Sequence, residues 1–475
     1  MCFQCIDGLG ALRGTSARRP QAPETTSRAA RCVRPSGAPS PIALALLGPR
    51  PRARPHPTAS PPLRQGCASP QLHRPLARGT TRHPEPGATS RTPAEASVRT
   101  SFSFPTTIEF GAGALASLPD HVRARGSRAF VVTDPGVRGL PIFDRVMAVL
   151  ADAGIVATST DAISPNPLAG ECEAGGRALR ASGADVVIGL GGGSALDAAK
   201  GVALMATHEG RIVDYDDAKG GWKLIRADVP PVICIPTTAG TGSEVGRSTV
   251  VIDEDTHTKV VVFSPFLMPK VAIVDPELMV GMPAWLTAAT GFDALTHNLE
   301  AFVAKGFHPM ADGIALEGIA QVHTHLVTAC RKPADLTARG GMAMAAMMGA
   351  TAFQKGLGAA HSLAHPLGSL AGVHHGLANA VVLPYVVAFN REAAAERYAL
   401  VERRLGLSEG LMEWLLALRR DIGIPHTLGE AGVSRALLEA LSDQAIADGC
   451  HGSNPRPCSR DDLRNLYVAA FDGNL

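Results

Sequence analysis

Five histidines and one aspartate in the second half of the chain have the residue types and spacing of a metal site. They form two pairs that are four residues apart and one adjacent pair: Asp293 with His297, His361 with His365, and His374 with His375. Residues four apart share one face of a helix. A lone histidine on an apolar helix face is more often a core or surface residue than a ligand. Six such residues in this arrangement favour metal binding.

The chemistry of these side chains narrows the choice of metal. One carboxylate with several imidazoles suits a borderline divalent ion such as Fe²⁺ or Zn²⁺, whereas Ca²⁺ and Mg²⁺ prefer oxygen ligands. The spacing alone does not select the ligands among the six candidates, and it does not distinguish iron from zinc. Five other histidines lack the pattern, and we expect them on the surface: His257, His308, His323, His325 and His426.

A glycine-rich turn in the first half has the composition of a phosphate-binding loop. Residues 189–194 read Gly-Leu-Gly-Gly-Gly-Ser, follow an apolar run and precede a predicted helix over residues 195–206. Glycines let the backbone approach a pyrophosphate, and a helix N-terminus supplies free N–H groups and a favourable dipole. The spacing departs from G-x-G-x-x-G because Ser194 occupies the third glycine position. Taken alone, the turn could equally be a tight connection.

A second polar, glycine-containing loop strengthens the nucleotide interpretation. Residues 236–244 read Pro-Thr-Thr-Ala-Gly-Thr-Gly-Ser-Glu and also follow an apolar run. Two such loops at the carboxyl ends of parallel strands mark the crevice where α/β sheets bind ligands. The alternative is a pair of ordinary turns in which the Ser and Thr hydroxyls cap helices. Asp134 follows the run at residues 130–133, where a carboxylate binds an adenosine ribose and repels a 2′-phosphate. We therefore expect NAD rather than NADP, although Asp134 could be a turn residue before Pro135.

The elements that position these residues follow from the apolar periods after about Phe102. Strand-like runs cover residues 129–133, 185–190, 232–235 and 271–274, and a helical period covers residues 142–150. This alternation predicts a parallel sheet with helices on both faces. Two β-branched runs, 249–252 and 260–263, predict an inserted hairpin. After Pro283 only helical periods remain, so we expect an α/β nucleotide-binding domain at residues 101–283 and an all-helical metal-binding domain at 284–475.

Residues 1–100 differ in composition from the rest of the chain. They hold 15 Arg, no Lys and only four acidic residues, and they are rich in Pro, Ser and Thr without an apolar period. We expect a disordered leader, which is either transit-like or the product of a start upstream of the true one. The frequent Pro residues do not suit an amphipathic targeting helix, which favours the second explanation.

The remaining composition restricts the partners and the compartment. The formal net charge of +2 indicates neither a nucleic-acid binder nor an acidic surface, and we find no apolar run long enough to span a bilayer. The nine cysteines are scattered and odd in number, which argues for a reducing compartment. We therefore expect a small-molecule substrate, no nucleic-acid or membrane partner, and a cytoplasmic location, or an organellar one if the leader is a transit peptide.

Four ordered motifs resemble those of the iron-containing (group III) alcohol dehydrogenases, whose members include lactaldehyde reductase and 1,3-propanediol dehydrogenase. They are Gly191-Gly-Gly-Ser194-x-x-Asp197-x-x-Lys200, the loop at residues 236–244, Gly291-x-Asp-Ala-Leu-Thr-His297, and His361-x-x-x-His365-Pro-Leu-Gly-x₆-His375-Gly. The similarity extends from about Phe102 to the C-terminus and includes His451-Gly-Ser-Asn454-Pro-Arg456. The leader has no counterpart in these motifs.

The resemblance implies a dehydroquinate synthase-like fold, in which an α/β dinucleotide-binding domain precedes an all-α metal-binding domain. It implies four metal ligands, Asp293, His297, His361 and His375. It also implies that His365 is a non-ligand histidine near the substrate, whereas His374 matches no motif position. The implied cofactor-binding residues are Asp134, Asn166, Gly192, Gly193, Ser194, Asp197, Thr237, Thr238, Thr241, Ser243 and Lys259. A homo-oligomer, dimer or larger, is implied as well.

The expected activity is that of an iron-containing, NAD-dependent alcohol dehydrogenase. Such an oxidoreductase transfers a hydride between NAD(H) and a small alcohol or aldehyde, and His365 would relay the proton. Zn²⁺ and NADP are the alternative cofactors. A hydroxyacid–oxoacid transhydrogenase, a glycerol dehydrogenase and a dehydroquinate synthase-like lyase are the alternative enzymes, but the lyase would need basic groups that are not evident near the histidine motifs. The sequence does not specify the substrate.

Overall fold

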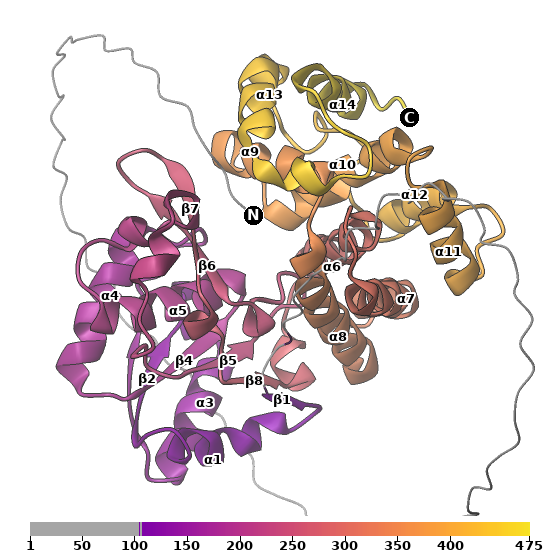
Figure 1. The fold of residues 1–475 in the computed structure, drawn as a ribbon. Helices are drawn as coiled ribbons and strands as arrows, with labels where there is room; N and C mark the ends of the chain where they lie inside the picture. The colour runs from indigo at the N-terminus through magenta and orange to yellow at the C-terminus, as the bar shows by residue number, and fades with distance from the viewer. Residues whose placement is uncertain (1–103, 105–106) are drawn as a thin grey trace, which may run out of the picture. The chain divides into compact units, whose positions relative to one another are not determined.

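The computed structural model describes Phe104 and residues 107–475 (Figure 1). The predicted leader, residues 1–100, lies outside the described residues. The described residues belong to one compact unit, so the boundary placed near residue 283 stays a prediction. The first half of this unit is an α/β layer structure and the second half is helical, which confirms the predicted fold class.

A six-stranded sheet organises the first half. Its strand order is β1-β8-β5-β4-β2-β3, and every neighbouring pair is parallel. The strands are β1 (Thr107–Phe110), β2 (Arg128–Val132), β3 (Val156–Thr160), β4 (Val186–Gly191), β5 (Val232–Pro236) and β8 (Val271–Val274). The four central strands were predicted. The two edge strands were not, because β1 and β3 are largely exposed and lack the apolar run of a strand buried on both faces.

Helices cover both faces of the sheet, as the alternating pattern predicted (Figure 1). Side chains of one strand alternate between the faces. Ala129 and Val131 pack with α1 (Leu118–Arg123) and α3 (Pro141–Asp152), whereas Phe130 and Val132 pack with the two helices at residues 169–182 and 193–207. Helices α4 (Ala169–Ser182) and α5 (Gly193–Thr207) lie side by side. A short helix, α2 (Pro135–Arg138), follows β2.

The predicted hairpin is present between β5 and β8. Strands β6 (Ser248–Asp253) and β7 (Thr258–Phe263) pair antiparallel, with Thr249 opposite Val262. Asp253 closes the turn, because its side chain accepts hydrogen bonds from the backbone N–H of Asp255 and the hydroxyl of Thr256. Lys259, one of the implied cofactor-binding residues, lies on β7 of this hairpin.

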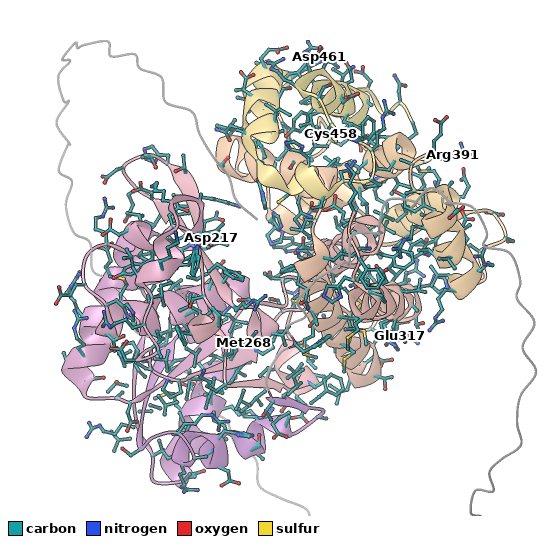
Figure 2. All side chains as sticks on the ribbon, in the orientation of Figure 1. Asp217, Met268, Glu317, Arg391, Cys458 and Asp461 are labelled. Atoms are coloured by element: carbon teal, nitrogen blue, oxygen red, sulfur yellow. The ribbon has the colours of Figure 1, made fainter. Side chains whose placement is uncertain are left out.

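The second half contains helices only, within the described residues. They are α6 (Ala284–Val303), α7 (Pro309–Arg331), α8 (Leu336–Ala352), α9 (Ala359–Ala371), α10 (His375–Asn390), α11 (Ala395–Leu405), α12 (Leu411–Asp421), α13 (Leu438–Ala447) and α14 (Arg460–Asp472). Their apolar faces form one core, which also includes Ala272 and Val274 of β8. Charged side chains lie at exposed positions of this half, such as Asp461 on α14 and Arg391 directly after α10 (Figure 2).

One surface prediction was wrong. His308 is buried, with 4% of its surface exposed. Its Nδ1 accepts a hydrogen bond from the backbone N–H of Ala311, so the imidazole caps the N-terminus of α7. The sequence pattern missed this because capping depends on local backbone geometry. None of the described helices is long and apolar enough to cross a membrane.

Candidate metal centre and nucleotide loops

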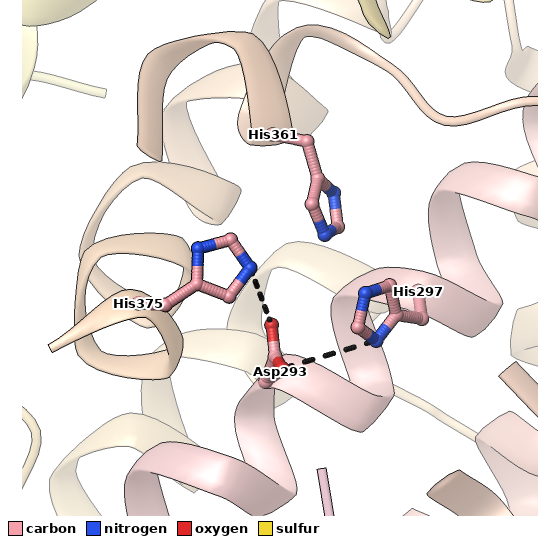
Figure 3. Close-up of side chains that lie close together, drawn as sticks. All are labelled: Asp293, His297, His361 and His375. Atoms are coloured by element: carbon pink, nitrogen blue, oxygen red, sulfur yellow. Dashed lines mark ion pairs between the residues drawn. The ribbon is translucent and has the colours of Figure 1, made fainter. Parts of the chain in front are cut away.

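Three helices carry the four implied metal ligands. Asp293 and His297 project from one face of α6, as their spacing predicted, and His361 projects from α9 (Figure 3). His375 is the first residue of α10. The next residue, Gly376, lets α10 approach α6 closely, because a Cβ there would lie 2.4 Å from the carbonyl oxygen of Ala289.

The four side chains converge. Each contributes a nitrogen or carboxylate oxygen, and these atoms all lie within 4.8 Å of one another. Asp293 is central: its Oδ2 lies 3.9 Å from His297 Nδ1, and its Oδ1 lies 3.5 Å from His375 Nε2. The rings of His297 and His361 stack with their centroids 4.6 Å apart. His374 is not in this group; it is exposed, and its ring lies edge-on to Trp285.

The protonation states suit metal binding. Burial opposes the ionisation of Asp293, but the surrounding histidines and Asn379 outweigh it and lower its pKa to about 2. Burial lowers the pKa of His297 to about 4 and the pKa of His375 well below its usual value. Near neutral pH the site therefore offers one carboxylate together with neutral imidazoles at His297 and His375.

A nitrogen lone pair without a partner indicates that a cation fits among the four converging side chains. Nδ1 of His297 is buried and has no hydrogen-bond partner in the chain, although it faces the Asp293 carboxylate. A buried polar atom without a partner is costly, and a divalent ion among these atoms would use its lone pair. One carboxylate and three imidazoles form a donor set for Fe²⁺ or Zn²⁺.

Asn379 is a site residue that the sequence reasoning missed. Its Nδ2 donates to Asp293 Oδ1 at 2.8 Å and lies 3.3 Å from Nε2 of both His361 and His375. Asn379 lies one helical turn after His375 on α10. That spacing was the available signal, but asparagine on a helix is too common for the spacing to have been specific.

Two carboxylates that pair with histidines were also missed. Glu300 Oε2 lies 2.6 Å from Nδ1 of His361, and Asp448 Oδ2 lies 2.7 Å from Nδ1 of His365. A carboxylate accepts hydrogen bonds, so this geometry favours the tautomer of each imidazole with its proton on Nδ1. For Glu300 a signal existed, because it lies seven residues after Asp293 on the same face of α6. For Asp448 we see none.

His365 lies beside the metal group but outside it. Its ring stacks on that of His375, with centroids 5.3 Å apart, and 27% of its side chain is exposed. His365, Asp448 and Cys450 themselves bring three potential ligand atoms within 4.8 Å of one another. However, burial raises the pKa of the Cys450 thiol well above its usual value, and Asp448 already accepts bonds from Ser362 and from the backbone of Cys450. Those contacts account for this group without a metal.

The two glycine-containing loops lie against each other. Strands β4 and β5 are neighbours, and the backbone N–H of Thr237 donates to the carbonyl oxygen of Gly191. Helix α5 begins at Gly193 with Gly192 as its N-cap. A Cβ on Gly193 would lie 2.6 Å from Thr241 Oγ1, and one on Gly192 would lie 3.3 Å from Thr238 Oγ1. Glycine at these positions therefore lets the second loop pack on the N-terminus of α5.

Asp197 and Ser243 are engaged with the protein itself. The hydroxyl of Ser243 donates to Asp197 Oδ1 and accepts from the buried Nζ of Lys200 at 2.7 Å. Lys200 also donates to the carbonyl oxygen of Ser248, and Asp197 Oδ2 accepts from the backbone of Val250. This network connects α5 to the second loop and to the hairpin, so these side chains fix the position of the two loops.

Two segments lie beside the first loop: Asp134, after β2, and Pro165 with Asn166, which the loop residue Ser194 contacts through Pro165. Asp134 Oδ1 caps α2 by accepting from Val137 N at 3.0 Å, which matches the turn role that had been the alternative. Its Oδ2 faces the loop, because a Cβ on Gly191 would lie 3.1 Å from it. The hydroxyl of Ser194 donates to the carbonyl oxygen of Pro165, and the next residue, Asn166, is exposed.

Lys259, on β7, interacts electrostatically with carboxylates on both sides of the candidate site. Burial lowers the pKa of Lys259, while the carboxylates of Asp448, Asp293 and Asp197 oppose that shift. Lys259 thus lies within electrostatic range of both regions. The backbone of Gly240, in the second loop, also raises the pKa of His297, although the opposite effect of burial is larger.

Comparison with known proteins agrees with this arrangement. Residues 105–276 match the family described as iron-containing alcohol dehydrogenase, and residues 287–471 match the C-terminal region of the Fe-containing alcohol dehydrogenase family. A 4-hydroxybutyrate dehydrogenase from Cupriavidus necator is 39% identical over 373 residues, covering 76% of this chain and 97% of that protein. A 1,3-propanediol dehydrogenase from Klebsiella pneumoniae is 36% identical over 359 residues, covering 73% and 92%.

Solved structures give the same result. A crystal structure of 1,3-propanediol oxidoreductase superposes with a TM-score of 0.75 at 34% identity, covering 79% of this chain and 100% of that one. A sulfoacetaldehyde reductase from Bifidobacterium kashiwanohense, in complex with NAD⁺, gives a TM-score of 0.73 at 29% identity, covering 78% and 99%. The two family matches span most of the described residues, and the chain belongs to the iron-containing alcohol dehydrogenase family.

Proposed function

We propose that this dehydrogenase interconverts a small alcohol and its aldehyde with NAD(H), at an Fe²⁺ ion held by Asp293, His297, His361 and His375. The observation that carries the proposal is the convergence of these four side chains, from three helices, within 4.8 Å. A bound divalent ion would supply Lewis-acid chemistry toward the alcohol or carbonyl oxygen. Zn²⁺ suits the same donors and is the alternative metal.

We assign the proton transfer to His365. Asp448 holds the Nδ1–H of this imidazole, so Nε2 is free to accept or donate a proton. The partial exposure of the ring gives it access to solvent, while its stacking on His375 keeps it next to the metal group. A general acid–base residue of this kind needs both properties.

The nucleotide would bind along the two packed loops. The N-terminus of α5 offers free N–H groups at Gly193 and Ser194 for a pyrophosphate. We assign the remaining nucleotide contacts to Gly192, Thr237, Thr238, Thr241, Asn166 and Lys259, with Asp197 and Ser243 supporting the second loop. Asp134 supports NAD over NADP, because its carboxylate beside Gly191 would repel a 2′-phosphate.

The proposal is tested by metal analysis combined with turnover. Purified protein should contain about one divalent ion per chain, and chelation should abolish NADH oxidation with a panel of small aldehydes and 2-oxo acids. Reloading the apoprotein with Fe²⁺ or Zn²⁺ separately then identifies the active metal. Turnover that persists in fully chelated protein would contradict the metal-dependent mechanism.

The same assay separates the alternative activity. A hydroxyacid–oxoacid transhydrogenase would exchange hydride between two substrates without added nucleotide, and no feature of the described residues favours that reaction over the simple dehydrogenase. The homo-oligomer and the cytoplasmic location stay proposals. Light scattering of the purified chain would test the first, and fractionation of cells would test the second.

A further inference from the structure

Glu300 is a buried carboxylate at the centre of the helical half. It lies on α6, three residues after His297, and only 3% of its surface is exposed. A buried carboxylate is costly unless hydrogen-bond donors surround it. The burial of Glu300 must therefore be compensated by the groups that its carboxylate contacts.

Three donors meet the Glu300 carboxylate, and all belong to the start of α9. Oε2 accepts from the backbone N–H of Gly358 at 2.9 Å and from Nδ1 of His361 at 2.6 Å. Oε1 accepts from the backbone N–H of Ala360 at 2.6 Å. One carboxylate thus holds both the first turn of the helix and the implied ligand on it.

This contact replaces an ordinary helix cap. The N-cap residue of α9 is Gly358, which has no side chain to cap the helix. Glu300 and Asn454 do so from elsewhere in the chain, since Asn454 Oδ1 accepts from the backbone of Ala359. A Cβ on Gly358 would lie 2.6 Å from Glu300 Oε1, so glycine makes room for the carboxylate. A negative charge at a helix N-terminus is also favourable.

We propose that Glu300 is a positioning residue for the metal centre: it fixes the Nδ1–H tautomer of His361 and holds α9 against α6. The Nε2 lone pair of His361 then faces Asn379 and the other ligands. This inference rests on the proposed metal site. Carboxylates that hold the second nitrogen of a ligand histidine contribute about 10- to 100-fold to metal affinity.

A purely structural role is the competing explanation, and the chain offers a matched control for it. Asp275 has no exposed surface and accepts hydrogen bonds from three backbone N–H groups, those of Gly113, Leu115 and Glu277. It contacts none of the implied ligands. Asp275→Asn therefore removes a buried carboxylate of equal connectivity without touching the metal centre.

The test compares the affinity of Glu300→Gln, Asp275→Asn and the unchanged full-length protein for Zn²⁺. Each is stripped of metal and titrated against a chromophoric chelator, and its thermal stability is measured without metal. We expect Glu300→Gln to bind Zn²⁺ about 10- to 100-fold more weakly, because an amide cannot accept from all three donors. Asp275→Asn should lose stability and keep its affinity.

The outcomes separate the explanations. If Glu300→Gln loses stability like Asp275→Asn but keeps the affinity for Zn²⁺, the positioning role is overturned. If the unchanged protein does not bind Zn²⁺ or Fe²⁺, the proposed metal site fails and this inference fails with it. Nitrogen NMR of the unchanged, histidine-labelled apoprotein is a second test that does not depend on a variant being folded. A proton of His361 on Nδ1 supports the inference, and a proton on Nε2 alone overturns it.

Discussion

Helix α9 carries two histidines, one turn apart, whose surroundings are alike in one respect and opposite in another. Nδ1 of His361 and Nδ1 of His365 each lie against a carboxylate oxygen, at 2.6 and 2.7 Å. The side chain of His361 is 1% exposed, whereas that of His365 is 27% exposed. In the proposed mechanism, the same carboxylate contact would prepare His361 to hold a metal ion and leave His365 able to exchange a proton with water.

The two carboxylates, Glu300 and Asp448, differ in the groups that donate hydrogen bonds to them. Glu300 comes from α6, the helix of Asp293 and His297, and its donors among the described residues all lie at the start of α9. Asp448 follows α13 and also accepts from Ser362 and from the backbone of Cys450. Glu300 thus connects α6 to α9, the helices that carry three of the implied ligands. Asp448 contacts the ring of His365, which lies beside the implied ligands.

The largest expected effect separates the two histidines directly. His361→Ala should lose the metal and turnover together, because it removes one of four ligands. His365→Ala should retain the metal while kcat falls about 10²- to 10⁴-fold, the usual contribution of a general acid–base residue. Elemental analysis and steady-state kinetics on the same samples measure both quantities.

His374→Ala is the matched control for this pair. The residue is adjacent to His375 in sequence, yet its ring contacts Trp285 and lies outside the metal group. Metal content and kcat should both stay near those of the unchanged protein. Full activity of His361→Ala after chelation, or metal loss in His374→Ala, would mean that the ligand assignment is wrong.

A smaller effect is expected from the carboxylate behind the proton relay. In Asp448→Asn the amide no longer favours the Nδ1–H tautomer of His365, so we expect kcat to fall about 10- to 100-fold with little change in metal content. KM should change less than kcat, because the ring acts on the proton and not on substrate binding. The kinetic constants at several pH values measure this split.

Asp443→Asn provides the comparison for Asp448→Asn. Asp443 lies on α13, is exposed and pairs with Arg460 at the surface, where an ion pair contributes about 0–1 kcal/mol. Its kinetics should be unchanged. If Asp448→Asn turned over substrate as fast as Asp443→Asn, the Asp448 carboxylate would be unnecessary for the proton relay. The similarity between the Asp448–His365 and Glu300–His361 pairs would then have no catalytic meaning.

The comparison also shows what could be read from the sequence. Spacing within one helix predicted that Asp293 and His297 share a face, and the glycine-rich turns predicted the loops after β4 and β5. The metal ligands were selected by resemblance to a family, because spacing left six candidates. The carboxylates lie 61 and 83 residues from their histidines along the chain. Local spacing places Glu300 on the face of α6 that carries Asp293, but its pairing with His361, like the pairing of Asp448 with His365, depends on tertiary packing that local patterns do not specify.

The smallest expected effect concerns Ser362, which follows His361 on α9 and is hydrogen-bonded to Asp448. Its hydroxyl donates to Asp448 Oδ1 at 2.9 Å and accepts from the backbone N–H of His451 at 2.8 Å. Ser362→Ala should destabilise the fold by about 0.5–1.5 kcal/mol, as expected for a buried hydrogen bond. Because the second oxygen of Asp448 still holds His365, kcat should fall only a few-fold, and metal content should not change. Denaturant unfolding and kinetics test this order of effects: a loss of kcat as large as that of Asp448→Asn would show that Ser362, and not the carboxylate alone, sets the orientation of the ring.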